Sequence, residues 1–411
     1  MSQPRRMLIC EEALKNHNGH WFEYNKAVVR MNRDEGVKVD LLAHCEVAPE
    51  IVDSLGAEPY FEWTNWDQIY YHPSAWRRYL GILRHNWRVF RAIRRRLRES
   101  EPYDLVFVPT VVIFHLIAWW FLATFDRGRK ARRIVLLIRN SAASYESEDG
   151  APVFPRSSRI LRFVLRRYRK LLASGRVRLT SDSHRLAEEY RQLADVEVTV
   201  APHPCLLLTP RELPERPTAA RALTLSLLGP ARWEKGVQVL LDALRILKDR
   251  SDTPPMRIVL QWPDPVLAPD GEELRLDAEE FRDSPIEIDV IDKSLTSEAY
   301  QQLLADSEVV VLPYLRQAYY ARISGVAVEA MLMGIPVIYT EDTWNSDMTE
   351  QFGGGLGFES ENAEDLADAL LKSAAGLEGY RSAARGRVPA ARAHFSKKNF
   401  LEALWGTENS K

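Results

Sequence analysis

Cysteine is scarce in this sequence: Cys10, Cys45 and Cys205 are the three among its 411 residues. They are far apart, odd in number and form no CxxC pair. This argues against a disulfide framework or a cysteine zinc site and favours a reducing compartment. The first apolar run, residues 7–10, ends at two glutamates and is too short for a secretory signal. We therefore expect a cytoplasmic chain.

Short motifs of several enzyme classes are absent as well. There is no P-loop, no GxGxxG after the first apolar run and no HExxH. No Asp-x-Asp stands at the end of a strand-like run, where a metal-dependent sugar transferase would need it. We expect neither a metal site nor a bound cofactor, so any catalysis should rely on side chains and a co-substrate.

Acids, lysine and arginine are missing from residues 105–125. This stretch of about 20 residues is long enough to span a bilayer. We interpret it instead as a buried strand over 105–108, a break at Pro109 and Thr110, and a buried helix over 112–125. A covered strand followed by a covered helix is what a parallel sheet requires. His115 falls inside that apolar helix, which is typical of a core histidine.

Acids are also absent from residues 76–98 and 156–170, which alternate arginine with apolar residues at helical spacing. Residues 1–200 carry about nine more bases than acids, although the whole chain has a net charge of −2. Two interpretations stay open: a solvated face of ordinary helices, or a peripheral contact with an anionic inner membrane face. Nucleic acid fits less well, because no nucleic-acid motif accompanies the bases.

Short apolar runs typical of strands alternate with helical patterns along the chain. They fall at residues 7–10, 37–43, 105–108, 134–138, 177–180 and 196–200, and then at 223–228, 257–261, 286–290, 309–312 and 336–339. This alternation predicts an α/β fold with parallel sheets covered by helices. Residues 206–222, rich in proline and charge, separate two doubly wound, Rossmann-like domains over 1–205 and 223–390. Ligands of such domains bind at the carboxyl ends of the strands, so we expect a cleft between the two domains.

The first chemical motif opens the second domain, where a loop with Gly229, Arg232, Lys235 and Gly236 follows a strand and precedes a leucine-rich helix. Basic side chains at such a junction can meet a phosphate as a fork and a point charge. The amino terminus of the helix adds free amides. The motif therefore suits a diphosphate, although such a motif standing alone is more often a pair of basic residues on a surface loop.

The second motif places Ser324 as the cap of a helix that ends at Gly334. An anion can bind the amides at Ser324, Gly325 and Val326, and Glu329 in an early turn can accept hydrogen bonds from two ribose hydroxyls. An ordinary helix cap followed by a solvated glutamate explains the same residues.

Together the two motifs resemble the donor site of the retaining, metal-independent glycosyltransferases of family 4, which have the GT-B fold. The pattern G…R..KG…LL.A lies over residues 229–243, and SG…EA…G.PVI follows over 324–338. Residues 295–314 also resemble this family, and residues 179–186 and 198–204 resemble the end of its acceptor domain. The resemblance covers nearly all of the second domain and parts of the first.

The resemblance implies roles for these residues. Arg232 and Lys235 would bind and stabilise the donor diphosphate, the amides of Gly325 and Val326 would contact it, and Glu329 would hold the ribose. The donor would be a nucleotide sugar, with UDP or GDP as the nucleotide. A final helix within residues 391–411 would return to the first domain.

Two positions depart from the family pattern. Ala321 stands where most members have a second glutamate that contacts the transferred sugar. Pro109 and Thr110 stand where many members have a histidine after a first-domain strand. Both departures concern the side of the site that would hold the sugar and the acceptor.

Polar residues after two first-domain strands are candidates for the acceptor side. The loop that ends in Gly19 and His20 follows the first strand, and Arg139 and Asn140 end another. Gly19 would let the backbone approach a ligand closely, and His20 would orient the acceptor hydroxyl or contact the leaving phosphate. A turn capped by an asparagine explains the first loop equally well.

These observations predict a glycosyltransferase that moves a sugar from a nucleotide-sugar donor to a glycan or lipid-linked acceptor, with retention and without metal. One alternative is a catalytically degenerate GT-B module that binds nucleotide or glycan as a scaffold, which Ala321 motivates. Another is an epimerase or phosphorylase of the same overall shape. An epimerase would convert the donor without an acceptor, and a phosphorylase would depend on phosphate.

Overall fold

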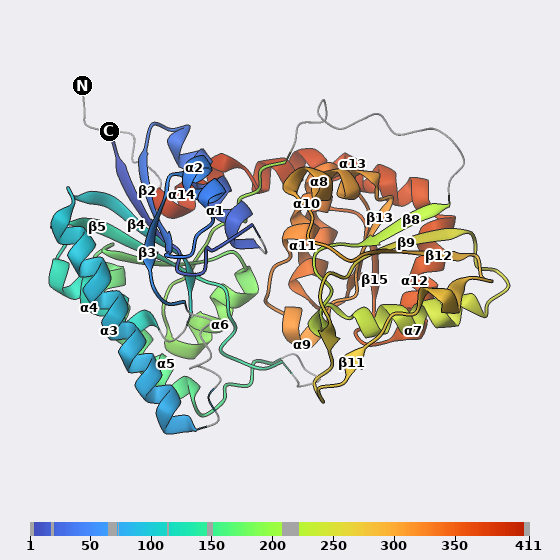
Figure 1. Cartoon of the computed structure of the whole chain (residues 1–411), viewed down its shortest axis with the longest axis horizontal. Coiled ribbons are helices and arrows are strands. Elements are labelled where there is room, and N and C mark those ends of the chain that lie inside the picture. The colour runs from blue at the N-terminus through green and yellow to red at the C-terminus, as the bar shows by residue number, and fades with distance from the viewer. Residues whose placement is uncertain are drawn as a thin grey trace. The chain divides into compact units, whose positions relative to one another are not determined.

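The computed structural model describes residues 4–17, 20–64, 72, 74–112, 115–145, 151–207 and 222–406, without the side chains of His20 and Ala75. The chain forms two compact units (Figure 1), one of Met1–Pro204 with Ser396–Lys411 and the other of Cys205–Phe395. Most of the predicted linker over 206–222 lies outside the described residues, so it stays a prediction.

The first unit is built on a seven-stranded parallel sheet with strand order β3-β2-β1-β4-β5-β6-β7. Its strands are β1 (Arg6–Cys10), β2 (Lys38–His44), β3 (Ala57–Phe61), β4 (Tyr103–Val111), β5 (Ala131–Ile138), β6 (Val177–Ser181) and β7 (Thr199–Val200). The central strands are apolar on both faces because helices cover both. The order reverses between β1 and β4, and ligands of doubly wound sheets bind beyond the carboxyl ends at such a point.

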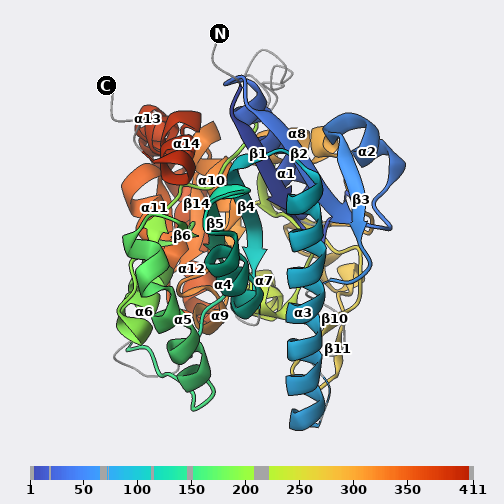
Figure 2. The same ribbon diagram turned by 90° about the vertical axis from the view of Figure 1, so that its left-hand side faces the viewer.

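Helices connect these strands and cover the sheet (Figures 1 and 2). They are α1 (His20–Arg33), α2 (Pro49–Leu55), α3 (Ala75–Glu99), α4 (Leu116–Asp126), α5 (Ser158–Ala173) and α6 (His184–Ala194). Neighbouring helices from α3 to α6 contact one another in sequence order. Right-handed crossovers place α3 to α6 on one face of the sheet and α1 and α2 on the other.

The charge-free stretch forms β4 and α4, but its predicted internal break was wrong. Strand β4 runs through Pro109 and Thr110 to Val111, with a register shift against β5 between Val108 and Val111. A proline has no N–H to donate, and a bulge is a place where a strand tolerates this loss. No helix among the described residues is long and apolar enough to cross a membrane.

The second unit has a six-stranded parallel sheet with strand order β12-β9-β8-β13-β14-β15. Its strands are β8 (Leu223–Leu227), β9 (Met256–Gln261), β12 (Ile286–Ile291), β13 (Val309–Leu312), β14 (Val337–Thr340) and β15 (Gly355–Phe358), beside a small hairpin of β10 (Val266–Leu267) and β11 (Glu273–Leu274). Its helices are α7 (Val237–Lys248), α8 (Ser297–Asp306), α9 (Arg316–Tyr319), α10 (Gly325–Met333), α11 (Trp344–Phe352), α12 (Ala363–Ala375) and α13 (Leu377–His394). Two short 3₁₀ turns, η3 (Trp233–Lys235) and η4 (Ala278–Phe281), complete it.

The last helix, α14 (Lys397–Trp405), belongs to the first unit, in which it contacts α1. Trp405 donates its indole N–H to Asn32 Oδ1 at 2.8 Å. Arg178 donates to the carbonyl of Ala403 at 2.7 Å, and Lys397 pairs with Glu35 at 2.6 Å. Helix α14 is therefore part of the structure of the first unit.

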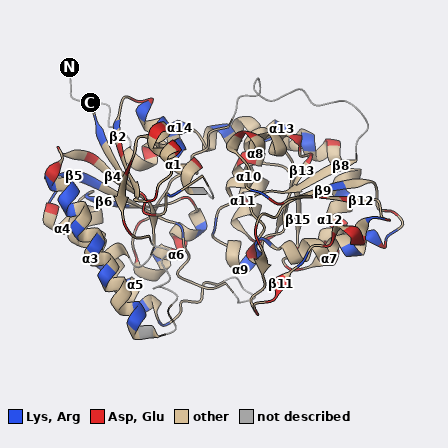
Figure 3. Cartoon of the chain, viewed as in Figure 1, with Lys and Arg blue, Asp and Glu red and all other residues tan. Residues whose placement is uncertain are grey.

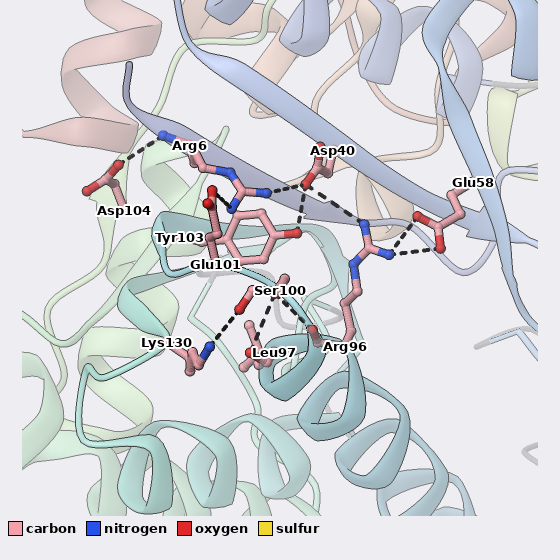
Figure 4. A network of polar contacts seen from close by, with 10 residues as sticks. All are labelled: Arg6, Asp40, Glu58, Arg96, Leu97, Ser100, Glu101, Tyr103, Asp104 and Lys130. Carbon is pink, nitrogen blue, oxygen red and sulfur yellow. Dashed lines mark hydrogen bonds and ion pairs between the residues drawn. The ribbon is translucent and has the colours of Figure 1, made fainter. Parts of the chain in front are cut away.

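A polar network binds the carboxyl end of α3 to the sheet of the first unit (Figure 4). Asp40 accepts from the Tyr103 hydroxyl at 2.7 Å and pairs with Arg6 at 3.1 Å. Arg96 of α3 pairs with Glu58 at 2.8 Å and lies 3.8 Å from Asp40. Partly buried ion pairs that share a carboxylate in this way fix the end of a helix more firmly than isolated surface pairs.

Candidate functional site

A glycine loop at the carboxyl end of β8 brings together the two motifs of the predicted donor site. Gly229 has a φ of 76°, and a Cβ on it would lie 2.8 Å from Lys235 Nζ and 3.9 Å from a methyl of Val326. The two predicted motifs thus meet at Gly229, where a side chain would separate them. Gln261, buried at the end of β9, holds the loop by accepting from the Gly229 amide at 2.8 Å and the Ala231 amide at 2.9 Å.

A second glycine lets the next turn pack against β13. Gly236 has a φ of 66°, and a Cβ there would come within 1.6 Å of the Pro313 carbonyl oxygen. The amide of Leu315 donates to the Glu234 carbonyl at 3.1 Å across the same contact. This close approach fixes Lys235, the residue before Gly236, over the ring of Tyr314 at 6.0 Å.

Three cations surround this loop. Burial, with Arg232 and Arg322 nearby, lowers the pKa of Lys235 to about 7. Glu234 Oε1 lies 3.8 Å from Arg232 and 3.9 Å from Arg322, so one carboxylate faces both guanidinium groups. Burial is the main cause of this low pKa and the two guanidinium charges add to it, so a bound polyanion would favour the protonated lysine.

Helix α10 begins beside the cations, with Ser324 as its cap. The Ser324 hydroxyl accepts from the Ala327 amide at 3.3 Å, and the carbonyl accepts from the Val328 amide at 3.2 Å. The amides of Gly325 and Val326 precede the first hydrogen bond of the helix, so they have no partner within it. Both amides and the positive end of the helix dipole are suited to an anion.

Glu329 lies one turn further along α10 and is half-buried. The Tyr300 hydroxyl of α8 donates to its Oε2 at 2.6 Å, which fixes the carboxylate. Burial, reinforced by the Glu329 charge, raises the pKa of Tyr300 well above its usual value, so the phenol keeps its proton. Charge-assisted bonds of this type are about twice as strong as neutral ones. Ala321, at the position where the family pattern has glutamate, is buried at 4% exposure.

In the first unit, polar side chains gather at the carboxyl ends of neighbouring strands. Glu11, directly after β1, accepts from the Thr110 hydroxyl of β4 at 2.8 Å and from the Ala13 amide at 3.2 Å. Burial raises the pKa of Glu11 to about 7, although the hydrogen bonds from Thr110 and Ala13 and the charge of Arg139 act in the opposite direction. Perturbed carboxyl groups of this kind concentrate at functional sites.

Arg139 follows β5 and is largely buried within the same unit. Its Nε lies 3.2 Å from Asp182 Oδ2, and its guanidinium lies 3.9 Å from the centre of the Tyr24 ring. Burial, with the charge of Arg139 nearby, lowers the pKa of His203 to about 3, so that ring is neutral. The carbonyl of Asn140 accepts from the Tyr190 hydroxyl at 3.1 Å. The structure therefore brings Arg139 to the strand ends near Glu11.

The structure describes little of the other two predicted acceptor-side residues, Gly19 and His20. Gly19 lies outside the described residues, and His20 is the first residue of α1 with its side chain undescribed. Their roles therefore stay predictions.

One group of metal-ligand type occurs among the described residues: Glu12, His85 and His115 offer ligand atoms within 4.8 Å of one another. His85 Nε2 lies 3.2 Å from Glu12 Oε2, and the two imidazole rings stack with centroids 4.3 Å apart and planes at 9°. Stacked rings direct their in-plane lone pairs along parallel planes rather than to one point, so the cluster suits a structural link between α3, α4 and β1. His115 caps α4 rather than lying inside it, and burial keeps it neutral by lowering its pKa.

Sequence reasoning missed four residues of these sites: Gln261, Tyr300, Arg322 and Glu11. Arg322 stands two positions before Ser324, so its place beside a helix amino terminus was the available signal. Glu11 ends the first strand at a strand-order reversal, which is also a readable signal. Gln261 and Tyr300 act through contacts across the sheet and between helices, and nothing local marks them.

Comparisons with known proteins agree with this description of the second unit. Residues 222–375 match the sequence model of the family described as "Glycosyl transferases group 1". No curated protein matches the chain in sequence.

Solved structures similar to the whole chain include HepE from Anabaena, solved with UDP, at 14% identity and a TM-score of 0.62, with 99% of this chain and 100% of that chain covered. Sucrose-phosphate synthase from Thermosynechococcus elongatus is similar at 15% identity and a TM-score of 0.64, with 97% of each chain covered. A glycosyltransferase from Rickettsia africae is similar at 14% identity and a TM-score of 0.61, with 100% of each chain covered.

At these identities the structural likeness shows the fold alone. The chain has two Rossmann-like halves of the GT-B type, as the sequence predicted. Its residues 222–375, which contain Gly229, the three cations and Glu329, have the sequence pattern of a group 1 glycosyl transferase domain.

Proposed function

We propose that the chain is a glycosyltransferase that moves a sugar from a nucleotide-sugar donor to a glycan or lipid-linked acceptor. The observation that carries this proposal is the grouping of Arg232, Lys235 and Arg322 around Gly229, beside the amides that open α10. A nucleoside diphosphate has the charge and size for this grouping. Glu329, fixed by Tyr300, is then available for the ribose hydroxyls.

The chemistry is substitution at the anomeric carbon. The bond from that carbon to the β-phosphate oxygen breaks as a bond to the acceptor oxygen forms, and the proton of the acceptor hydroxyl passes to an oxygen of the departing diphosphate. Negative charge grows on the diphosphate, where the three cations and the helix amides stabilise it by preorganised electrostatics. These groups can serve in place of a divalent metal, which supports metal-independent transfer. Retention of the anomeric configuration rests on the resemblance to family 4.

UDP is the nucleotide to test first and GDP the second. The Anabaena HepE structures contain UDP, UDP with glucose, or UDP-glucose, and they share this fold. On the acceptor side, Glu11 and Arg139 lie at the carboxyl ends of the first-unit strands with Thr110 and Asp182. We place the activity in the cytoplasm, where the three free cysteines would stay reduced.

A thermal-shift series tests the donor site. UDP, GDP, ADP and CDP are added with and without EDTA to the wild type, to Lys235→Ala and to Lys372→Ala, an exposed lysine on α12 of the same unit. A ligand at about 100 times its dissociation constant should stabilise the fold by about 2.7 kcal/mol. We expect one nucleotide to raise the melting temperature of the wild type and of Lys372→Ala regardless of EDTA, and to have no effect on Lys235→Ala. Stabilisation by none of the four would contradict the donor site.

Measuring turnover of the nucleotide sugar distinguishes an enzyme from a degenerate binding module. The observation in favour of a binding module is Ala321, which is buried where the family pattern has glutamate. Release of the nucleotide from its sugar conjugates, measured with extracted glycans and lipids as acceptors, is expected for a transferase. Nucleotide binding without release from any conjugate would show the binding module. Conversion of the donor without an acceptor would show an epimerase.

A further inference from the structure

The outward face of α3 in the first unit is apolar where a surface helix is normally polar. Trp76, Tyr79, Leu80, Leu83 and Trp87 are each between 51% and 62% exposed. Their spacing of three and four residues places them in one stripe along the helix. The opposite side of the helix packs in the core of the unit, where Val89, Ile93 and Leu97 are buried. Helix α3 thus has two apolar faces, and one of them lies open.

The stripe continues onto the neighbouring helix through aromatic contacts. Phe90 of α3 lies 5.9 Å from Trp87 and 6.2 Å from Phe121 of α4, measured between ring centroids. Phe121 stacks on Phe125 at 5.8 Å, and Phe125 is 62% exposed. Helices α3 and α4 therefore share one exposed apolar surface.

Helix α5 extends this surface further. It contacts α4, and the Trp120 indole of α4 donates to the Arg167 carbonyl of α5 at 3.1 Å. Ile160 and Phe163 of α5 are more than half exposed. We call the exposed side of α3, α4 and α5 the arginine–aromatic face; Figure 2 shows these three helices as neighbours on one side of the first unit.

The charge on this face is mostly positive. Glu99 is the sole acid in α3, among nine arginines, and α5 has five arginines and a lysine without an acid. Figure 3 shows the basic residues recurring along α3. Three arginines lie over aromatic rings of these helices: Arg91 over exposed Trp87 at 5.9 Å, Arg94 over partly buried Phe90 at 5.7 Å and Arg167 over exposed Phe163 at 4.6 Å.

We propose that the arginine–aromatic face docks on an anionic phospholipid membrane. Tryptophan and tyrosine favour the boundary between headgroups and acyl chains, and leucine, isoleucine and phenylalanine enter its apolar side. The long arginine side chains reach back to the phosphates, which attract them electrostatically. Nucleic acid would match the positive charge of the face but not its exposed leucines and isoleucine. A protein partner would match the apolar residues but would not require basic residues along all of α3 and α5.

The contacts that hold α3 in the first unit are consistent with a docking surface. The network of Asp40, Arg96 and Glu58 fixes the carboxyl end of the helix (Figure 4), and the pair of His85 with Glu12 fixes its middle from the buried side. The arginine in these contacts, Arg96, points to the sheet. The apolar stripe is thus presented by a rigid element, so binding needs little ordering of the chain.

Vesicle flotation of the 411-residue chain tests the proposal. The experiment is done without donor or acceptor, so its outcome is independent of the transferase proposal. We expect binding to vesicles of phosphatidylcholine with phosphatidylglycerol, weaker binding to phosphatidylcholine alone, and a loss of binding at high salt. Leu80→Ser/Leu83→Ser and Arg84→Glu/Arg91→Glu should each weaken binding by about tenfold or more.

Matched variants of the second unit provide the controls. Leu267→Ser/Val290→Ser and Arg275→Glu/Lys293→Glu change exposed residues in the same way and should keep wild-type binding. An unchanged melting temperature shows that each variant is folded. The proposal is overturned by absence of binding to both vesicle types, by equal effects of the face and control variants, or by a wild-type dimer that Leu80→Ser/Leu83→Ser dissociates. The last outcome would assign the face to a second copy of the chain.

Discussion

Lys235 is a lysine with a pKa of about 7, because it is buried beside Arg232 and Arg322. A diphosphate interacts with the protonated form, so binding should take up a proton when the free site is partly deprotonated. We expect the affinity for UDP to be full below pH 7 and to fall as the pH rises above it, by up to about tenfold per unit. Isothermal titration at pH 6 to 9 in buffers of different ionisation enthalpy measures both effects.

Lys235→Arg is the matched control for this pH dependence, since arginine keeps its charge throughout the range. Its affinity for UDP should change little between pH 7 and 9. An equally steep pH profile in Lys235→Arg would mean that another group carries the titration. The lowered pKa also makes the unfolded state bind more protons than the folded state between pH 7 and 10.5, so this residue lowers the stability of the free protein at neutral pH.

Glu329 and Tyr300 are predicted to act as a unit in ribose binding. Glu329→Ala removes a charged acceptor and should weaken UDP binding by about tenfold or more. Tyr300→Phe leaves the carboxylate but removes the 2.6 Å bond that fixes it, so a smaller loss is expected. Binding of 2′-deoxy-UDP should be less sensitive to both changes than binding of UDP. Tyr380→Phe, in α13, is the control, and equal losses for both nucleotides would exclude the ribose contact.

Glu11 should make the protein less stable as the pH rises. Its pKa is about 7 in the folded chain against 4.5 for an ordinary glutamate, so the unfolded state binds fewer protons between these values. The free energy of unfolding therefore falls as the pH rises through this range. Glu11→Gln should be more stable than the wild type at pH 8, by up to about 3 kcal/mol at about 1.4 kcal/mol per unit. Near pH 4.5 the difference should vanish. Urea unfolding at pH 4.5 and pH 8 measures the difference in the free energy of unfolding between Glu11→Gln and the wild type. Glu50→Gln, at an exposed position, is the control. A difference that does not change with pH would contradict the raised pKa of Glu11.

Among the elements, the turn η3 depends on a single glycine. Gly236→Ala combines a left-handed φ of 66° with a Cβ 1.6 Å from the Pro313 oxygen, so β13 and η3 would have to separate. We expect a loss of more than about 3 kcal/mol, the upper end of backbone strain alone, and a loss of UDP binding with it. Urea unfolding and titration calorimetry report the two effects.

Substitutions at two other glycines distinguish the cost of backbone strain from the cost of steric overlap with Pro313. Gly271 has a φ of 90° with open space around it, so Gly271→Ala should cost about 1 kcal/mol. Gly379, in α13, also has open space, and Gly379→Ala should stabilise by roughly 0.5–1 kcal/mol. If Gly236→Ala proved no worse than Gly271→Ala, the contact with Pro313 would not be rigid.

Strands with a continuous apolar run were predictable, and strands held by their neighbours were not. Most strands of both sheets were expected close to their observed positions. Strand β15, with the sequence GLGF, carries too few apolar residues to be recognised. It forms because Gly355 allows the chain to lie against Val337, whose oxygen would be 1.8 Å from a Cβ. Strand β3, with the sequence AEPYF, also lacks a continuous apolar run and was missed. Its Pro59 is tolerated because β3 lies at the edge of the sheet.

The turn and the helix caps of the predicted donor site were predictable because their signals are local. Gly229, Ser324 and Gly334 take the turn and cap positions that their residue types favour. The residues that hold the site together, Gln261 and Tyr300, lie on other elements, so only the packing of β9 and α8 reveals them. The polar group at the strand ends of the first unit was least predictable, because burial rather than the neighbouring sequence raises the pKa of Glu11.

At the scale of the whole molecule, each unit carries its own polar group at the carboxyl ends of its strands. The second unit contributes cations and helix amides, and the first contributes a carboxyl group with a raised pKa and an arginine. The first unit additionally carries the arginine–aromatic face on α3 to α5. Under the two proposals made above, donor binding belongs to one unit and acceptor and membrane contacts to the other, so we expect mutations to separate the two functions.

Helix α14 follows the second unit in the sequence but belongs to the first unit. Deletion of residues 396–411 removes the bonds of Trp405 with Asn32 and of Arg178 with Ala403, and the pair of Lys397 with Glu35. We expect the first unit to melt at a lower temperature while the second keeps its stability and its stabilisation by UDP, since separate units unfold separately. Calorimetry with hydrogen exchange of α1, β5 and β6 resolves the two units. Lys398→Ala, on the exposed side of α14, should leave both transitions in place; a deletion that lowered the stability of the second unit equally would show that α14 serves both.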